Sequence, residues 1–187
     1  MTSNGQYQYK EQQIVLREKS TLTIRPAKKE DAEDILKHIC LVGDESPFLS
    51  FTSDEVFWSV EREEEIIDEH NSSDNQLFLI GLIEGHIVAV SNVHSTYKKR
   101  GRHMGELGIS VVKAHWSKGI AKAVMNYIIE WGKDNKIIEK LTLEVLDSNA
   151  KAITLYENLG FEQEGRMKKA SIVDGQYHDL IRMSLFV

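Results

Sequence analysis

The sequence is poor in cysteine and proline, and it has no long apolar run. One cysteine, Cys40, occurs among 187 residues, which excludes an internal disulfide framework and predicts a reducing compartment. No apolar run approaches the roughly 20 residues that span a bilayer. The polar residues 1–10 lack the apolar core of a signal peptide. We therefore expect a cytoplasmic protein without a membrane segment.

Basic residues are outnumbered by acidic ones, giving a net charge of −6. This balance argues against non-specific nucleic-acid binding and favours a cationic substrate. The hydrophobic fraction of 41% and the charged fraction of 28% are ordinary for a globular protein. Internal repeats, linkers and low-complexity segments are not evident in the sequence. We expect a single domain over residues 21–187, preceded by an N-terminal extension, residues 1–20, whose polar residues 1–13 form a loosely attached arm.

The central stretch of the chain predicts a strand, a tight turn and a helix. Residues 107–112 are apolar and rich in β-branched side chains, which indicates a buried strand. Ser117 and Gly119 form the turn, and apolar residues at helical spacing follow from Lys118. The first N–H groups of such a helix lack intrahelical partners and suit a diphosphate. The same junction is also common as plain architecture, and the glycine patterns of P-loops and dinucleotide-binding folds are absent.

The first half of the chain predicts two strands, two helices and a hairpin. The first helix, 30–41, places Cys40 on its apolar side, where we expect a buried structural cysteine. The second helix is expected to begin with the capping residues at Thr52 and to run to Glu69. It is strongly acidic, which predicts either a solvated face or a surface that attracts an amine. The expected strands are 14–17, 22–25, 77–83 and 86–94, and a basic turn follows at 98–103.

The last third of the chain predicts a strand, a short helix and a hairpin. Residues 140–145 alternate apolar and polar side chains, as a strand with one wet face does. Ser148 or Asn149 can cap the helix that follows, and Gly160 can end it. The Asp-Gly pair at 174–175 favours a tight turn between strands 161–172 and 176–186.

Two motifs together resemble the GNAT superfamily of acetyltransferases. The first is the family's Gln/Arg-x-x-Gly-x-Gly/Ala motif, matched by Trp116-Ser117-Lys118-Gly119-Ile120-Ala121. The second lies about thirty residues downstream and is matched by Asn149, Ala152, Leu155, Tyr156, Gly160 and Phe161. Trp116 departs from the usual Gln or Arg. Because backbone N–H groups make most phosphate contacts in such a loop, the resemblance predicts that the site survives and that Trp116 packs over the cofactor or substrate mouth.

The resemblance implies an α+β fold. Its central sheet is mixed and mostly antiparallel, with about seven strands splayed between the fourth and fifth and about four flanking helices. It implies an N-acetyltransferase that uses acetyl-CoA, with no metal, and a homodimer through the last hairpin is plausible. The implied acetyl-CoA ligands are the strand residues Ile109, Val111 and Val112, the corner residues Trp116, Ser117, Lys118, Gly119, Ile120 and Ala121, and Asn149 with Tyr156.

The implied reaction needs a general acid and a base. Tyr156 stands at the family's general-acid position, where it gives a proton or hydrogen bond to the leaving thiolate. Glu106 and Glu144 are equally good candidates for the base that takes the amine proton, and a water chain is a further alternative. His103 is a weaker candidate, since a surface histidine explains it as well.

Two classes of function fit these residues. The first is an N-acetyltransferase for an amine of a small molecule or peptide, and the second is an acyl-CoA sensor without turnover. Tyr156 favours the enzyme, because a sensor does not need a proton donor. The acceptor remains open among polyamines, amino acids, peptide N-termini and antibiotics, and the acidic helix favours a cation.

Overall fold

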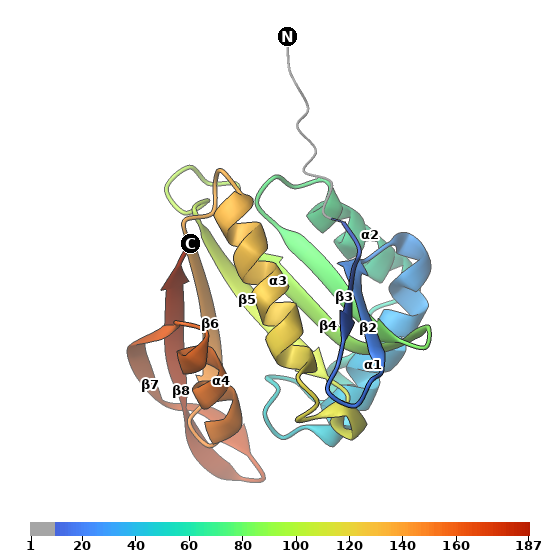
Figure 1. The fold of residues 1–187 in the computed structure, drawn as a ribbon. Coiled ribbons are helices and arrows are strands. Elements are labelled where there is room, and N and C mark those ends of the chain that lie inside the picture. Colours follow the sequence, from blue (N-terminus) through green and yellow to red (C-terminus); the bar gives the residue numbers. More distant parts are fainter. Residues whose placement is uncertain (1–9) are drawn as a thin grey trace.

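The protein is built around one eight-stranded sheet, described by a computed structural model over residues 10–187 (Figure 1). The strand order is β1-β2-β3-β4-β5-β6-β8-β7, and all neighbours are antiparallel except the parallel pair β5 and β6. The mixed, mostly antiparallel sheet is thus confirmed, with one strand more than the family resemblance implies. The strands are β1 Gln12–Val15, β2 Thr21–Pro26, β3 Leu77–Ile83, β4 His86–His94, β5 Met104–Val111, β6 Lys140–Leu146, β7 Glu162–Val173 and β8 Gln176–Phe186.

Four α-helices cover the two faces of this sheet (Figure 1). α3 and α4 pack on one face, over a core that includes Leu107, Leu141 and Leu143. α1 and α2 pack on the other, over Phe78 and Ile80. Within residues 10–187 no helix combines the length and the apolar character needed to cross a bilayer. The helices are α1 Ala32–Glu45, α2 Val60–Asn71, α3 Ile120–Asp134 and α4 Ala150–Asn158, with 3-10 turns η1 Lys29–Asp31, η2 Ser53–Glu55 and η3 Lys113–His115.

The strands β5 and β6 pair over only part of their length and then separate. They pair only over Met104–Glu106 and Lys140–Thr142, so residues 107–111 of β5 have β4 as a neighbour but not β6. This is the expected splay between the family's fourth and fifth strands, shifted by one number because β1 precedes them. Gly105 lies in the last paired stretch, where a Cβ would come within 2.5 Å of Val93 Cγ1. A larger residue at this position therefore has no room unless its neighbours move.

Several expected boundaries need correction. Gln12 and Gln13 belong to the edge strand β1, which pairs with β2, rather than to a loose arm, and residues 1–9 lie outside the described part of the chain. β5 begins at Met104, three residues earlier than expected, and α3 begins at Ile120 rather than Lys118. Cys40 is half-buried rather than buried.

The second helix is capped at Ser59, seven residues later than the sequence suggests. Thr52 does supply capping chemistry, because its N–H donates to the Glu55 carboxylate at 2.9 Å. This cap belongs to the short turn η2, and the chain leaves helical geometry after it. Ser59 then caps α2, its Oγ accepting a hydrogen bond from the Arg62 N–H at 3.3 Å. The chemistry of a cap is therefore the same for a single turn and for a long helix.

Candidate active site

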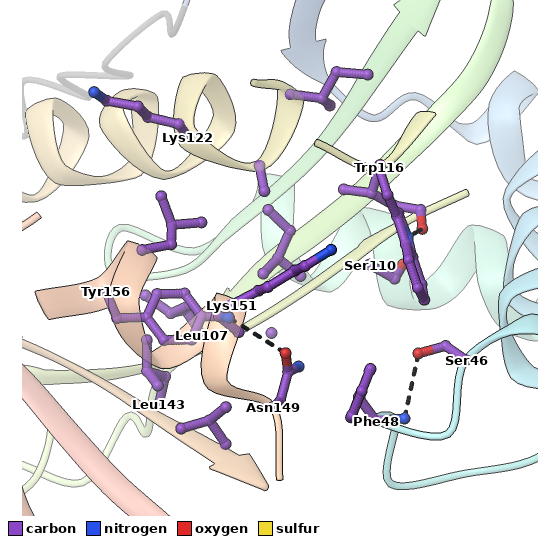
Figure 2. A pocket seen from close by; sticks show the side chains of 18 of the residues that line it. Ser46, Phe48, Leu107, Ser110, Trp116, Lys122, Leu143, Asn149, Lys151 and Tyr156 are labelled. Atoms are coloured by element: carbon purple, nitrogen blue, oxygen red, sulfur yellow. Dashed lines mark hydrogen bonds between the residues drawn. The ribbon is translucent and has the colours of Figure 1, made fainter. Parts of the chain in front are cut away.

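One large cavity collects the residues that the two motifs supply. Its volume is about 1750 Å³, beyond the 300–1,000 Å³ usual for a small-molecule pocket. It is lined by the unpaired part of β5, by β6, by the corner before α3, by the start of α4, and by residues 46–50 after α1 (Figure 2). All the expected site residues line it except Val112, whose N–H is used in the sheet, donating to the Val88 carbonyl at 3.0 Å.

The corner before α3 leaves backbone N–H groups facing the cavity. Ser117 has φ of 63° and Gly119 φ of 90°, so both lie in the left-handed region that turns the chain sharply into the helix. A Cβ at Gly119 would meet nothing within 4 Å, so backbone conformation, not crowding, calls for glycine there. Gly119 is the N-cap of α3 and no side chain caps it. The first N–H groups of this 15-residue helix, with its positive dipole end, therefore suit a diphosphate.

Three lysines of the cavity lining add positive charge, and the side chains of Lys122 and Lys151 point in different directions (Figure 2). Lys118 and Lys122 come from the corner and the first turn of α3, and Lys151 comes from the first turn of α4. Lys118 also lies 3.4 Å from the Glu18 carboxylate. Sequence reasoning missed Lys122 and Lys151, although the spacing of Lys118 and Lys122 places them one helical turn apart. In a chain with a net charge of −6, this cluster favours an anionic ligand locally.

Trp116 forms a side wall of the cavity. Its Nε1–H donates to the Val111 carbonyl at 2.6 Å, which ties the indole to the end of β5. The ring centroid lies 6.5 Å from that of Phe48 in the chain after α1 (Figure 2). The indole nitrogen therefore satisfies a backbone group at the point where a Gln or Arg side chain was expected.

Tyr156 lies on the opposite side of the cavity from Trp116, beside Leu107 and Leu143 (Figure 2). The side chain is buried on α4, and its ring centroid is 6.0 Å from that of Phe161. Burial raises the pKa of the phenol to about 12. Among the residues that the structure describes, none accepts a hydrogen bond from its hydroxyl. Tyr156 is thus a neutral phenol whose proton is available to a ligand.

Asn149 is committed in part to the fold. Its side-chain oxygen accepts a hydrogen bond from the Ala152 N–H at 3.3 Å and so caps α4 (Figure 2). The amide nitrogen of the same side chain remains as a donor on the cavity side. The sequence anticipated both the cap and a ligand contact, and one side chain can serve both.

The two candidate bases share one cation. Glu106 on β5 and Glu144 on β6 both line the cavity. Arg182 on β8 lies between them, with Nη2 3.7 Å from the Glu106 carboxylate and Nη1 3.6 Å from that of Glu144. His103 is placed elsewhere: it lies outside the cavity lining, and its carbonyl accepts from the Glu139 N–H at 2.9 Å in the turn before β5.

The unpaired end of β5 is also attached to α1. His38 is buried on α1, with Nε2 2.9 Å from Ser110 Oγ. Burial lowers the pKa of His38 to about 4, against a smaller opposing effect of the Ile87 backbone. The imidazole is therefore neutral near pH 7 and acts as a fixed hydrogen-bonding group between helix and strand.

Comparison with known protein families decides the assignment. The model of the acetyltransferase (GNAT) family matches residues 45–161, from the end of α1 through the corner and Tyr156 to Phe161. This chain belongs to the GNAT family. Members of the family take an acetyl group from acetyl-CoA, and the open N–H groups, the lysine cluster and the unpaired edge of β5 fit that donor chemically.

GNAT relatives with different acceptors resemble this chain. The spermidine N(1)-acetyltransferase of Vibrio cholerae is 27% identical over 173 residues, covering 88% of this chain and 92% of that protein. The L-amino acid N-acetyltransferase AaaT of Escherichia coli is 31% identical over 106 residues, covering 57% of this chain and 65% of that protein. A GNAT acetyltransferase structure from Streptococcus pneumoniae superposes with a TM-score of 0.86 at 30% identity, covering 89% of this chain and 99% of that one.

The acidic helix of this GNAT chain lies away from the cavity. Of the residues in the described range, none from α2 lines it. Arg62 pairs with Glu65 and Glu69 at 2.9 and 3.1 Å. Glu63 is buried rather than solvated: it accepts from Trp58 Nε1 at 2.8 Å, and burial raises its pKa. The charge of α2 therefore gives little support to a cationic acceptor.

Proposed function

We propose that this GNAT N-acetyltransferase transfers the acetyl group of acetyl-CoA to a primary amine by direct attack in a ternary complex. The acceptor is an amine of a small molecule or a peptide. The observation that carries the proposal is a single cavity that joins an anion-binding helix start to a neutral, buried phenol. A non-catalytic acyl-CoA sensor would need the first feature but not the second.

The donor would be held along one wall of this cavity. The N–H groups of the corner, with Lys118, Lys122 and Lys151, would hold its phosphates. The backbone of β5 beyond Glu106 would pair with the pantetheine arm as an added strand would, because β6 has left that edge free. The Asn149 amide nitrogen would donate a hydrogen bond to the same arm.

The acetyl transfer itself would use the carboxylates and the phenol at the other end of the cavity. A primary amine with a pKa of about 10 must lose a proton before it attacks, and Glu106 or Glu144, directly or through water, would accept it. The nitrogen forms a bond to the thioester carbonyl carbon while the carbon–sulfur bond breaks, and the electron pair leaves on sulfur. Tyr156 would donate its proton, or a hydrogen bond, to that sulfur, and the second proton of the acylated nitrogen would return to the phenolate or leave to water.

A thiol-release assay with a panel of amines tests this proposal. We would compare spermidine, free L-amino acids and short peptides, because the relatives above act on spermidine and on L-amino acids. Turnover with any of them above the background hydrolysis rate supports the enzyme. Tight binding of acetyl-CoA without thiol release across the panel would favour the sensor instead.

A homodimer through the last hairpin is a further prediction. Met167, Ile172 and Tyr177 are exposed apolar side chains of β7 and β8. Ile172 and Tyr177 are paired across the two strands, and adjacent exposed apolar side chains are typical of an interaction surface. Sedimentation equilibrium of the purified chain measures the association state, and a monomer at high protein concentration would contradict it.

A further inference from the structure

The loop of residues 46–52 forms one wall of the cavity, which we take as the side open to the acceptor. Its base is fixed: the Ser53 hydroxyl donates to the Asp44 carboxylate, and a Cβ at Gly43 would lie 2.9 Å from the Ser53 nitrogen. Phe48 and Leu49 at its tip line the cavity. Within the loop, the tip is held by a hydrogen bond from the Phe48 N–H to Ser46 Oγ at 3.3 Å (Figure 2).

The end of α1 and this loop each touch the segment that leads into the corner proposed for the donor. Glu45, the last residue of α1, accepts a hydrogen bond from the Lys113 N–H at 2.8 Å. Lys113 is the first residue of η3, so the carboxylate caps the turn that leads directly to Trp116. Phe48 then packs near Trp116, with ring centroids 6.5 Å apart. The two contacts join segments that are more than 60 residues apart in the chain.

We propose that Glu45 and Phe48 are positioning residues that transmit binding of the acetyl donor to the 46–52 loop. The inference rests on the proposed function, since it takes the corner as the donor's diphosphate site. A ligand on the corner N–H groups restricts η3 and Trp116, and these restrict the loop through the Glu45 cap and the Phe48 ring. The acceptor then meets a wall that is already ordered, so less conformational entropy is lost when the amine binds.

Such coupling is reciprocal and is measurable as a ratio of affinities. Coupling between two sites is typically worth a factor of about 5 to 150 in affinity. We expect removal of the Glu45 cap to raise the acceptor Kd measured with acetyl-CoA bound, and the acetyl-CoA Kd measured with acceptor bound, by the same factor of at least about five, with kcat changing less than about twofold. Glu45 lies outside the cavity lining, so its substitution changes the loop without removing a ligand contact.

Hydrogen exchange with coenzyme A as the probe tests the inference without an identified acceptor. We would compare the wild type, Glu45→Ala, Phe48→Ala and the control Glu55→Ala. Glu55 is a matched control because it also accepts a backbone N–H of this loop, from Thr52 at 2.9 Å, but within residues 10–187 it forms no hydrogen bond or ion pair with η3. We expect coenzyme A to slow exchange at residues 117–122 in all four proteins. Slower exchange at 46–52 should appear in the wild type and Glu55→Ala only.

The outcomes separate this inference from the proposed function. Protection at 117–122 without protection at 46–52 in the wild type overturns the inference and leaves the donor site standing. Equal loop protection in Glu45→Ala and in the wild type also overturns it. Absence of coenzyme A binding overturns the donor site and the inference together. Phe48→Ala keeps the test decisive if Glu45→Ala does not fold, because Phe48 is at the loop tip rather than at a helix end.

Discussion

Replacing Tyr156 with phenylalanine removes the proposed proton donor and little else. The hydroxyl has no partner among the described residues, so its loss leaves no buried group unpaired. The ring keeps its contact with Phe161. We therefore expect the thermal unfolding midpoint of Tyr156→Phe to stay within about 2 °C of the wild type. Activity should behave differently, because general acid catalysis typically contributes 10²–10⁴-fold.

The pKa of Tyr156 determines how the loss of activity in Tyr156→Phe depends on pH. With a pKa of about 12, about one phenol in a thousand is ionised at pH 9, since each pH unit below the pKa is a factor of ten. The neutral donor is thus present throughout the assay range. We expect kcat of Tyr156→Phe to fall by about 10²–10⁴-fold, equivalent to about 2.7–5.4 kcal/mol of barrier.

The assay is thiol release at saturating acetyl-CoA from pH 7 to pH 10, with wild type and variant side by side. Ionisation of the amine acceptor affects both proteins equally and cancels in their ratio, which should be constant over this range. Two results would refute the reasoning. One is a kcat of Tyr156→Phe within about threefold of the wild-type value. The other is a ratio of wild-type to variant kcat that falls towards pH 10, as it would if Tyr156 ionised like an ordinary phenol.

The remaining predictions concern charge. His38 has its pKa lowered from 6.5 to about 4, so the unfolded chain binds a proton before the folded one as the pH falls. The free energy of unfolding should be at its full value above pH 6.5 and about 2 kcal/mol lower at pH 5. Urea unfolding measures this loss, and His38→Gln should lack this part of the pH dependence. Glu106→Gln and Glu144→Gln distinguish the two candidate bases. The variant that removes the base should lose about 10²-fold or more in kcat, and the other should lose less than tenfold. Small losses of kcat in both variants would indicate a water chain. Lys122→Ala and Lys151→Ala should raise the acetyl-CoA KM. This increase should be smaller in 1 M salt than in 0.05 M salt, because the Debye length falls to about 3 Å. An increase in KM that does not depend on salt would contradict a phosphate contact.

Local patterns predicted most of the strands and helices. β3 and β4 begin and end where the sequence suggests, because two runs rich in apolar residues and the intervening Glu84-Gly85 turn are all local signals. The last hairpin behaves alike: Asp174 and Gly175 both have positive φ, as the Asp-Gly pair predicts for a tight turn. Nearly all residues of the two motifs line one cavity for the same reason, since each motif is a single turn with its adjoining helix.

The features that sequence reasoning missed depend on contacts across the sheet or between distant segments. Arg182 meets Glu106 and Glu144 only because β5, β6 and β8 are neighbours, and strand order is not written in any local pattern. The Glu45 cap on Lys113 likewise joins α1 to the chain after β5. In the sequence, Glu63 is one more charged residue of an acidic helix. In the structure its side chain is buried and accepts a hydrogen bond from Trp58.

Gly105 has a consequence for the reach of the active site. Its missing side chain lets β5 approach Val93 at the last stretch where β5 and β6 remain joined, with only 2.5 Å available for a methyl group. An alanine there would displace Val93 or push β5 away from β4, the strand that carries Val93. We expect either shift to move the unpaired edge of β5, and with it the depth at which an acetyl donor could seat in the cavity. A glycine outside the cavity lining would in this way help to set the position of the edge proposed for the donor.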